Sequence, residues 1–98
     1  MELPISRITD IGSGHGSFIP TPAIQGSNNV FAGGLPVFRE GDSLAPHPSV
    51  TPSPPHPRKA NKGSSTVITN GKGTMRIGDS IDCGGFMMTG YPTVIVGG

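Results

Sequence analysis

The sequence has little that would support a disulfide-stabilised, membrane-spanning or nucleic-acid-binding protein. It contains one cysteine, no tryptophan, 13% charged residues and a net charge of only +1 at pH 7. A single cysteine cannot form an internal disulfide, and a near-neutral chain supplies no basic field for nucleic acid. No apolar run is long enough to span a bilayer. Residues 1–10 also lack the charged start and apolar stretch of a secretory signal.

Glycine and proline are abundant instead, with 16 and 11 copies among 98 residues. They interrupt nearly every stretch of the chain, and no segment shows the 3.6-residue apolar spacing of an amphipathic helix. A chain of this length forms one small domain with a limited core, so a bound metal is the most accessible additional source of stability. We therefore expect a single all-β domain over residues 1–98.

Two short patterns alternate along the chain, and each occurs three times. The first runs from Gly through Asn or Thr, Val, and Phe or Ile to a final Gly, at residues 26–34, 63–71 and 90–98. The second is Arg-x-x-Asp, and its copies begin at Arg7, Arg39 and Arg76. Together they define three repeat units, at about 7–34, 39–71 and 76–98.

Each Val-Phe or Val-Ile pair indicates a short strand, because such residues suit a pleated, half-buried surface. The Gly-Gly or Asn-Gly that follows is typical of a hairpin turn with positive φ. Return strands are expected at 35–39 and 72–76, whereas the third unit ends without one. Since no unit could bury its own apolar face, we expect three similar hairpin repeats around an approximate threefold axis. The candidates for their shared core and base are Val30, Phe31, Val67, Ile68, Val94 and Ile95.

Residues 44–62 form an insertion in the second unit, with six prolines and no apolar alternation. Composition alone is typical of a flexible linker, but two histidines within it favour an ordered loop. Its basic residues Arg58, Lys59 and Lys62 are expected to lie in solvent, with contact to acidic lipid head groups as the alternative. The aspartate of each Arg-x-x-Asp pattern is expected to hold a turn through its side chain.

The histidines and the cysteine fall in register with the repeats. His15 and His47 each follow a repeat aspartate by five residues, and Cys83 follows one by four. Equivalent positions around a threefold axis converge at one end of a molecule, and His56 from the insertion would supply a fourth ligand. Four such ligands suit a structural zinc ion with no open position, and iron could occupy the same set. The competing interpretation is a set of scattered surface histidines and a buried thiol.

Residues 26–42 match the signature Gly-Ser-x-x-Val-Phe-x-x-Gly-x-Pro-x-x-Arg-x-Gly-Asp, and residues 63–79 match it with Ile68 in place of the phenylalanine and Gly73 in place of the proline. Over nearly its whole length the chain thus resembles the PAAR-repeat proteins, the spike-tip family of contractile phage tails and type VI secretion systems. The resemblance implies a small cone with zinc or iron near its apex, bound by three histidines and one cysteine.

The resemblance also implies a non-enzymatic, membrane-piercing tip that caps the trimeric β-helical spike of a contractile injection machine, one copy per trimer. The six apolar strand residues would face the spike, and the apex would meet the target-cell envelope transiently. A phage baseplate is favoured, which would place the protein in the virion. The alternative is a type VI secretion tip that recruits effectors and leaves the bacterial cytoplasm on the spike.

Two other functional classes are less consistent with the composition. A zinc-dependent hydrolase would need acid–base residues, but three of the four aspartates repeat as turn residues and only Asp82 stands apart. A zinc module that binds nucleic acid would need a basic excess and more aromatic residues. We therefore expect no small-molecule substrate and no nucleic-acid partner.

Overall fold

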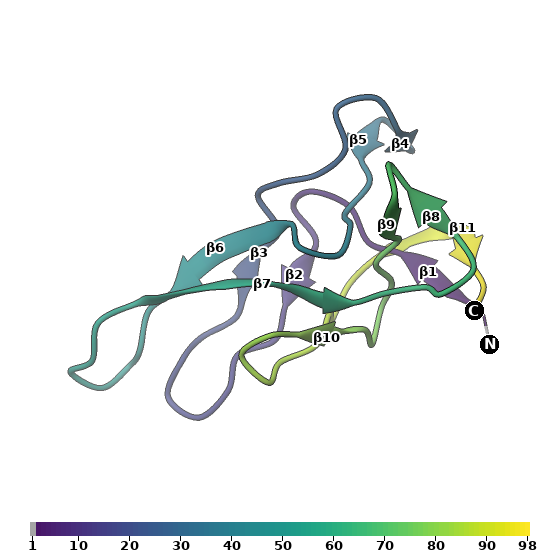
Figure 1. The fold of residues 1–98 in the computed structure, drawn as a ribbon. Helices are drawn as coiled ribbons and strands as arrows, with labels where there is room; N and C mark the ends of the chain where they lie inside the picture. Colours follow the sequence, from purple (N-terminus) through teal and green to yellow (C-terminus); the bar gives the residue numbers. More distant parts are fainter. Residues whose placement is uncertain (1) are drawn as a thin grey trace.

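A computed structural model of the chain describes residues 2–98, and every regular element in that range is a β-strand (Figure 1). Most strands span only two or three residues, because glycine and proline recur so often. No helix in the described range has the length and apolarity that a bilayer crossing needs. The predicted all-β fold is confirmed. The strands are β1 Leu3–Ile5, β2 Ile11–Gly12, β3 Thr21–Pro22, β4 Phe31–Ala32, β5 Leu35–Pro36, β6 Ser43–His47, β7 His56–Lys62, β8 Ile68–Thr69, β9 Lys72–Gly73, β10 Ser80–Ile81 and β11 Tyr91–Val96.

A closed ring of three backbone hydrogen bonds forms the centre of the molecule. The amide of Ser6 donates to the carbonyl of Met75 (2.9 Å), Met75 donates to Phe38 (2.9 Å), and Phe38 donates back to Ser6 (3.0 Å). All three residues are fully buried, and each directly precedes the arginine of one Arg-x-x-Asp pattern. A cyclic arrangement of equivalent bonds requires an approximate threefold axis through the ring, in agreement with the repeated sequence patterns.

A second set of backbone hydrogen bonds repeats around the same axis. The residue after each repeat arginine donates to a carbonyl three positions before another repeat arginine. The three bonds are Ile8 to Pro36 (3.0 Å), Glu40 to Gly73 (2.9 Å) and Ile77 to Pro4 (3.0 Å). Each unit is therefore bonded to the next one, and the third unit is bonded to the first.

The three aspartates hold their turns, as predicted. Asp10, Asp42 and Asp79 each accept a hydrogen bond from the backbone amide of the arginine three residues earlier, at 2.7–2.9 Å. The side chains also form ion pairs in the second and third units, at 2.8 and 2.9 Å, but the first pair is separated by 3.9 Å.

The three hairpins gather at one end of the molecule, which measures 39 × 26 × 22 Å (Figure 1). The turns of the β4–β5 and β8–β9 hairpins, at 33–34 and 70–71, have positive φ angles, as their Gly-Gly and Asn-Gly sequences predict. The third hairpin has no turn. Instead β11 pairs with β1 at the start of the chain, so that Val96 lies opposite Leu3. This N-terminal strand supplies the return strand that the third unit was expected to lack.

The Pro-rich insertion is an ordered hairpin and not a linker. Strands β6 and β7 pair antiparallel, with His47 opposite His56. Strand β7 also pairs with β10, so it is the central strand of a three-stranded sheet. The tip of this hairpin and the loops that follow β2 and β10 extend away from the end that carries the three other hairpins (Figure 1).

The prediction that the Val-Phe and Val-Ile pairs form the core is wrong. Five of these six residues are exposed: Val30, Phe31, Val67, Ile68 and Ile95. Only Val94 packs partly against a buried cluster. The side chains that point inward are the next residues along the strands, Ala32, Thr69 and Val96, because alternate strand residues face opposite sides. The main core instead contains Ala23, Phe38, Leu44, Ala60, Met75, Ile81 and Met87.

Candidate metal centre

Ligand atoms from three separate segments meet at one place. His15, His47 and Cys83 each offer one ligand atom, and these atoms all lie within 4.8 Å of one another. His15 lies in the loop between β2 and β3, His47 ends β6, and Cys83 follows β10. His47 is fully buried and the other two are half-buried. One ligand thus comes from each repeat, and the cluster can hold a metal ion.

His56 lies beside this three-residue cluster. Its Nε2 is 2.9 Å from Nε2 of His47, and its ring centroid is 5.3 Å from that of His15. The pairing of β6 with β7 sets this position, because it places the two histidines opposite each other across the hairpin. The structure therefore brings His15, His47 and Cys83 together and places His56 next to the two other histidines.

Hydrogen bonds to the backbone determine which nitrogen of each ring carries a proton. Nδ1 of His47 lies 3.0 Å from the carbonyl oxygen of Ile19, and Nδ1 of His56 lies 3.1 Å from that of Pro57. A carbonyl can only accept, so both Nδ1 atoms donate and both Nε2 atoms of the neutral rings are left with lone pairs. Two lone pairs that face each other at 2.9 Å repel, unless a cation binds them. Two nitrogens on one tetrahedral zinc are about 3.3 Å apart, somewhat more than the observed 2.9 Å, so the two rings would separate slightly on binding an ion.

The surroundings of His15 and His47 also favour binding of a cation. Nε2 of His15 is buried and has no hydrogen-bond partner within the described part of the chain. An unpaired buried polar atom costs about 1–3 kcal/mol, and coordination would remove that cost. Burial lowers the pKa of His47, and the positive charge of Arg58 lowers it further. A lowered pKa keeps the imidazole neutral, which is the form that binds metal.

The aromatic ring of Phe18 covers the histidines, a contact that sequence reasoning missed. Its centroid lies 4.4 Å from His56, 5.0 Å from His47 and 5.4 Å from His15. Reciprocal backbone hydrogen bonds between His15 and Phe18, at 3.1 and 2.9 Å, close a tight turn that directs both rings to the same side. Such an apolar neighbour limits the access of water to the ligands. Proximity to His15 in the sequence was the only available signal.

The prediction that Arg58 lies in solvent is wrong. The residue is 1% exposed, because the alternation of β7 turns Arg58 and Ala60 inward while Lys59 and Lys62 remain exposed. Its guanidinium donates to the carbonyl oxygens of Gly12 (2.8 Å) and Ser13. A basic residue that directly precedes an exposed lysine carries no sequence signal for burial, so only the structure shows this position.

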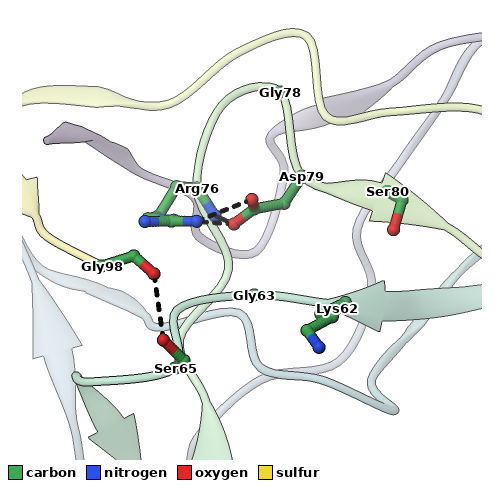
Figure 2. Close-up of a pocket in the computed structure, with 8 residues that line it drawn as sticks. All are labelled: Lys62, Gly63, Ser65, Arg76, Gly78, Asp79, Ser80 and Gly98. Atoms are coloured by element: carbon green, nitrogen blue, oxygen red, sulfur yellow. Dashed lines mark hydrogen bonds and ion pairs between the residues drawn. The ribbon is translucent and has the colours of Figure 1, made fainter. Parts of the chain in front are cut away.

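A hollow of about 470 Å³ lies apart from the histidines, beside the last residue of the chain (Figure 2). Its lining contains Lys62, Gly63, Ser65, Arg76, Gly78, Asp79, Ser80 and Gly98. Arg76 is already paired with Asp79 across it, and the Ser65 hydroxyl donates to the Gly98 carbonyl. None of the lining residues is a histidine or a cysteine, so this hollow is separate from the candidate metal centre.

The chain matches a known protein family. The family model described as PAAR motif matches residues 13–89. The matched range contains all four predicted metal ligands and both copies of the extended signature. No curated protein matches the chain.

Proposed function

Since the chain belongs to the PAAR-motif family, we propose that it is the structural tip of a contractile injection machine and caps the end of a trimeric β-helical spike. A single chain with three similar units can cover a threefold surface. The open end of a trimeric β-helix exposes three sets of strand edges, which favour aggregation unless they are covered. The proposed role is therefore mechanical and protective, and it requires no catalysis.

The observation that carries this proposal is a threefold set of apolar side chains at the end away from the histidines. Phe31, Ile68 and Ile95 occupy equivalent repeat positions and are 56%, 54% and 47% exposed. They belong to β4, β8 and β11, whose hairpins share one end of the molecule (Figure 1). Exposed apolar groups in such a set are typical of an interaction surface. Together with Val30, Val67 and Val94 they form the proposed base.

We further propose that one zinc ion, with iron as the alternative, is held at the other end by His15, His47, His56 and Cys83. Imidazole and thiolate are usual zinc ligands, and a four-ligand site is structural. The ion would hold the two loops and the insertion hairpin together. A phage baseplate is the favoured setting, with a virion location. A type VI secretion spike is the alternative, in which the tip would also recruit effectors.

The proposal is tested by mixing the metal-loaded protein with purified β-helical spike trimers and measuring the mass of the complex by light scattering. One chain per trimer is expected. Phe31→Asp, Ile68→Asp and Ile95→Asp would each place a charge in the interface and weaken binding at least tenfold, which corresponds to about 1.4 kcal/mol. Val50→Asp is the matched control, because Val50 is 77% exposed in the loop of the insertion hairpin. Unchanged binding of all three base variants, or a stoichiometry other than one per trimer, would reject the base assignment.

A further inference from the structure

Arg58 is the largest fully buried side chain of the described residues, and it is charged. Burial of a guanidinium costs several kcal/mol unless it is paired. The three ion pairs found within residues 2–98 all use other arginines. Arg58 is compensated differently, by a group of oxygen acceptors and by one sulfur atom. This arrangement needs a physical reason, since an apolar side chain of similar length could fill the same space.

The oxygen acceptors of Arg58 all belong to the hairpin that carries His15. Nη2 donates to the carbonyls of Gly12 (2.8 Å) and Thr21 (3.1 Å), and to the Thr21 hydroxyl (3.0 Å). Nη1 donates to the carbonyl of Ser13, two residues before His15. Arg58 therefore fixes both strands of the hairpin at the base of the loop that presents this ligand.

The same side chain also reaches the other ligand-bearing segments. Nη1 lies 4.0 Å from Sγ of Cys83, within N–H···S range. Arg58 itself follows His56 by two residues on β7, and the Thr21 hydroxyl that accepts from it donates in turn to Ala45, two residues before His47, at 2.6 Å. One guanidinium thus connects the backbone or side-chain atoms next to all four proposed ligands.

We infer that Arg58 is a positioning residue of the metal centre, which holds the His15 hairpin and the Cys83 sulfur in the arrangement needed to share one ion. This inference rests on the proposed metal centre. An N–H donor to a metal-bound thiolate draws electron density from the sulfur, so Arg58 affects the bound ion as well as the fold. Loss of such outer contacts typically lowers metal affinity by 10–100-fold.

The test compares Arg58→Met and Arg58→Lys with the wild-type protein and with Lys59→Met. Lys59 is the matched control, because it is the next residue on β7 but is exposed. Zinc affinity is measured by competition with a chromophoric chelator, and the absorption spectrum is recorded for the cobalt(II)-saturated proteins. We expect 10–100-fold weaker zinc binding by Arg58→Met and a smaller loss for Arg58→Lys, which keeps the charge but has fewer donors. The thiolate-to-cobalt band should move to longer wavelength in both variants, and Lys59→Met should match the wild type.

The spectrum distinguishes positioning from a purely structural role. A residue that only filled space would lower the melting temperature but leave the spectrum of the bound cobalt unchanged. An unshifted band together with wild-type zinc affinity in Arg58→Lys would overturn the inference even if Arg58→Met failed to fold. If the wild-type protein bound neither zinc nor cobalt, the proposed metal centre would be wrong. If the wild-type protein binds both metals and the Arg58 variants have the same zinc affinity and cobalt spectrum as the wild type, only the role of Arg58 would be rejected.

Discussion

Restoration of the missing proline in the second signature should destabilise the protein. At position 73 the family signature has proline, as at Pro36, but this chain has glycine. The Gly73 amide donates to Oε1 of Glu40 at 3.3 Å, and the Glu40 carboxylate also accepts from the Gly63 amide at 2.8 Å. A Cβ atom at residue 73 would contact Oε2 of Glu40 and lie 2.6 Å from its Cδ and 2.7 Å from the Ser64 carbonyl oxygen. The carboxylate therefore occupies the space that a proline ring needs.

The contacts give the size of the effect. Proline has no amide hydrogen, so Gly73→Pro removes one bond to a charged acceptor, worth about 1.5–3 kcal/mol. Displacement of Glu40 would also leave the buried Gly63 amide unpaired, at about 1–3 kcal/mol. Proline also reduces the entropy of the unfolded chain, which offsets roughly 0.4–1 kcal/mol of this loss of stability. We expect a net loss of about 2–4 kcal/mol, or a fall of about 10–25 °C in Tm for a domain of this size.

Thermal and denaturant unfolding, followed by circular dichroism at a fixed zinc concentration, would measure the effect. Pro36→Gly is the matched control and should cost only about 0.4–1 kcal/mol. Glu40→Ile should recover a substantial part of the stability lost in Gly73→Pro, because Ile8 and Ile77 occupy the positions equivalent to Glu40. A Gly73→Pro variant as stable as the wild type, or a lack of recovery with Glu40→Ile, would show that the Glu40 carboxylate does not exclude proline at position 73.

Three further predictions concern the metal centre and the turns. A chelator should lower the melting temperature strongly, since structural zinc contributes on the order of 10 kcal/mol. An unchanged melting temperature after complete metal removal would contradict a structural role of the ion. Cys83→Ser should lower the metal content measured by mass spectrometry. The lowered pKa of His47 means that the unfolded chain binds a proton at a higher pH than the folded protein. The contribution of neutral His47 to stability is therefore complete above about pH 6.5 and is lost as the pH falls toward the pKa of His47 in the folded protein. Denaturant titrations in which stability rises on acidification would contradict the lowered pKa of His47. Asp42→Asn should destabilise by at least about 1 kcal/mol more than Asp10→Asn, because the Asp42 carboxylate is fully buried and lies 2.8 Å from Arg39, whereas Asp10 is partly exposed and lies 3.9 Å from Arg7. Equal losses in equilibrium unfolding would show that the turn bonds dominate.

The threefold arrangement and the convergence of the ligands could be predicted because both depend on register in the sequence. His15, His47 and Cys83 follow their repeat aspartates by nearly equal intervals. The central ring of hydrogen bonds relates the three units by an approximate threefold axis, so residues at equal intervals from their repeat aspartates lie at equivalent positions around that axis. His56 required one more observation, namely that a second histidine within a Pro-rich insertion favours a fold in that segment.

Other features depend on contacts that leave no local pattern. Strands of two residues are too short for alternation to reveal which side faces inward, so the sequence predicts Phe31 and Ile68 in the core although the buried residues are Ala32 and Thr69. The pairing of β1 with β11 joins the two ends of the chain, and nothing near residue 98 indicates it. The burial of Arg58 depends on acceptors that lie far away in the sequence, in the hairpin that begins with β2.

In the proposed metal centre, three repeats and one insertion converge on a single metal ion. X-ray absorption at the zinc edge of the zinc-loaded protein, combined with metal analysis, determines whether they do. We expect one zinc per chain, with three nitrogen neighbours at about 2.0–2.1 Å and one sulfur neighbour at about 2.3 Å. A zinc shell that lacks sulfur, or one that contains a bound water in place of an imidazole, would contradict it.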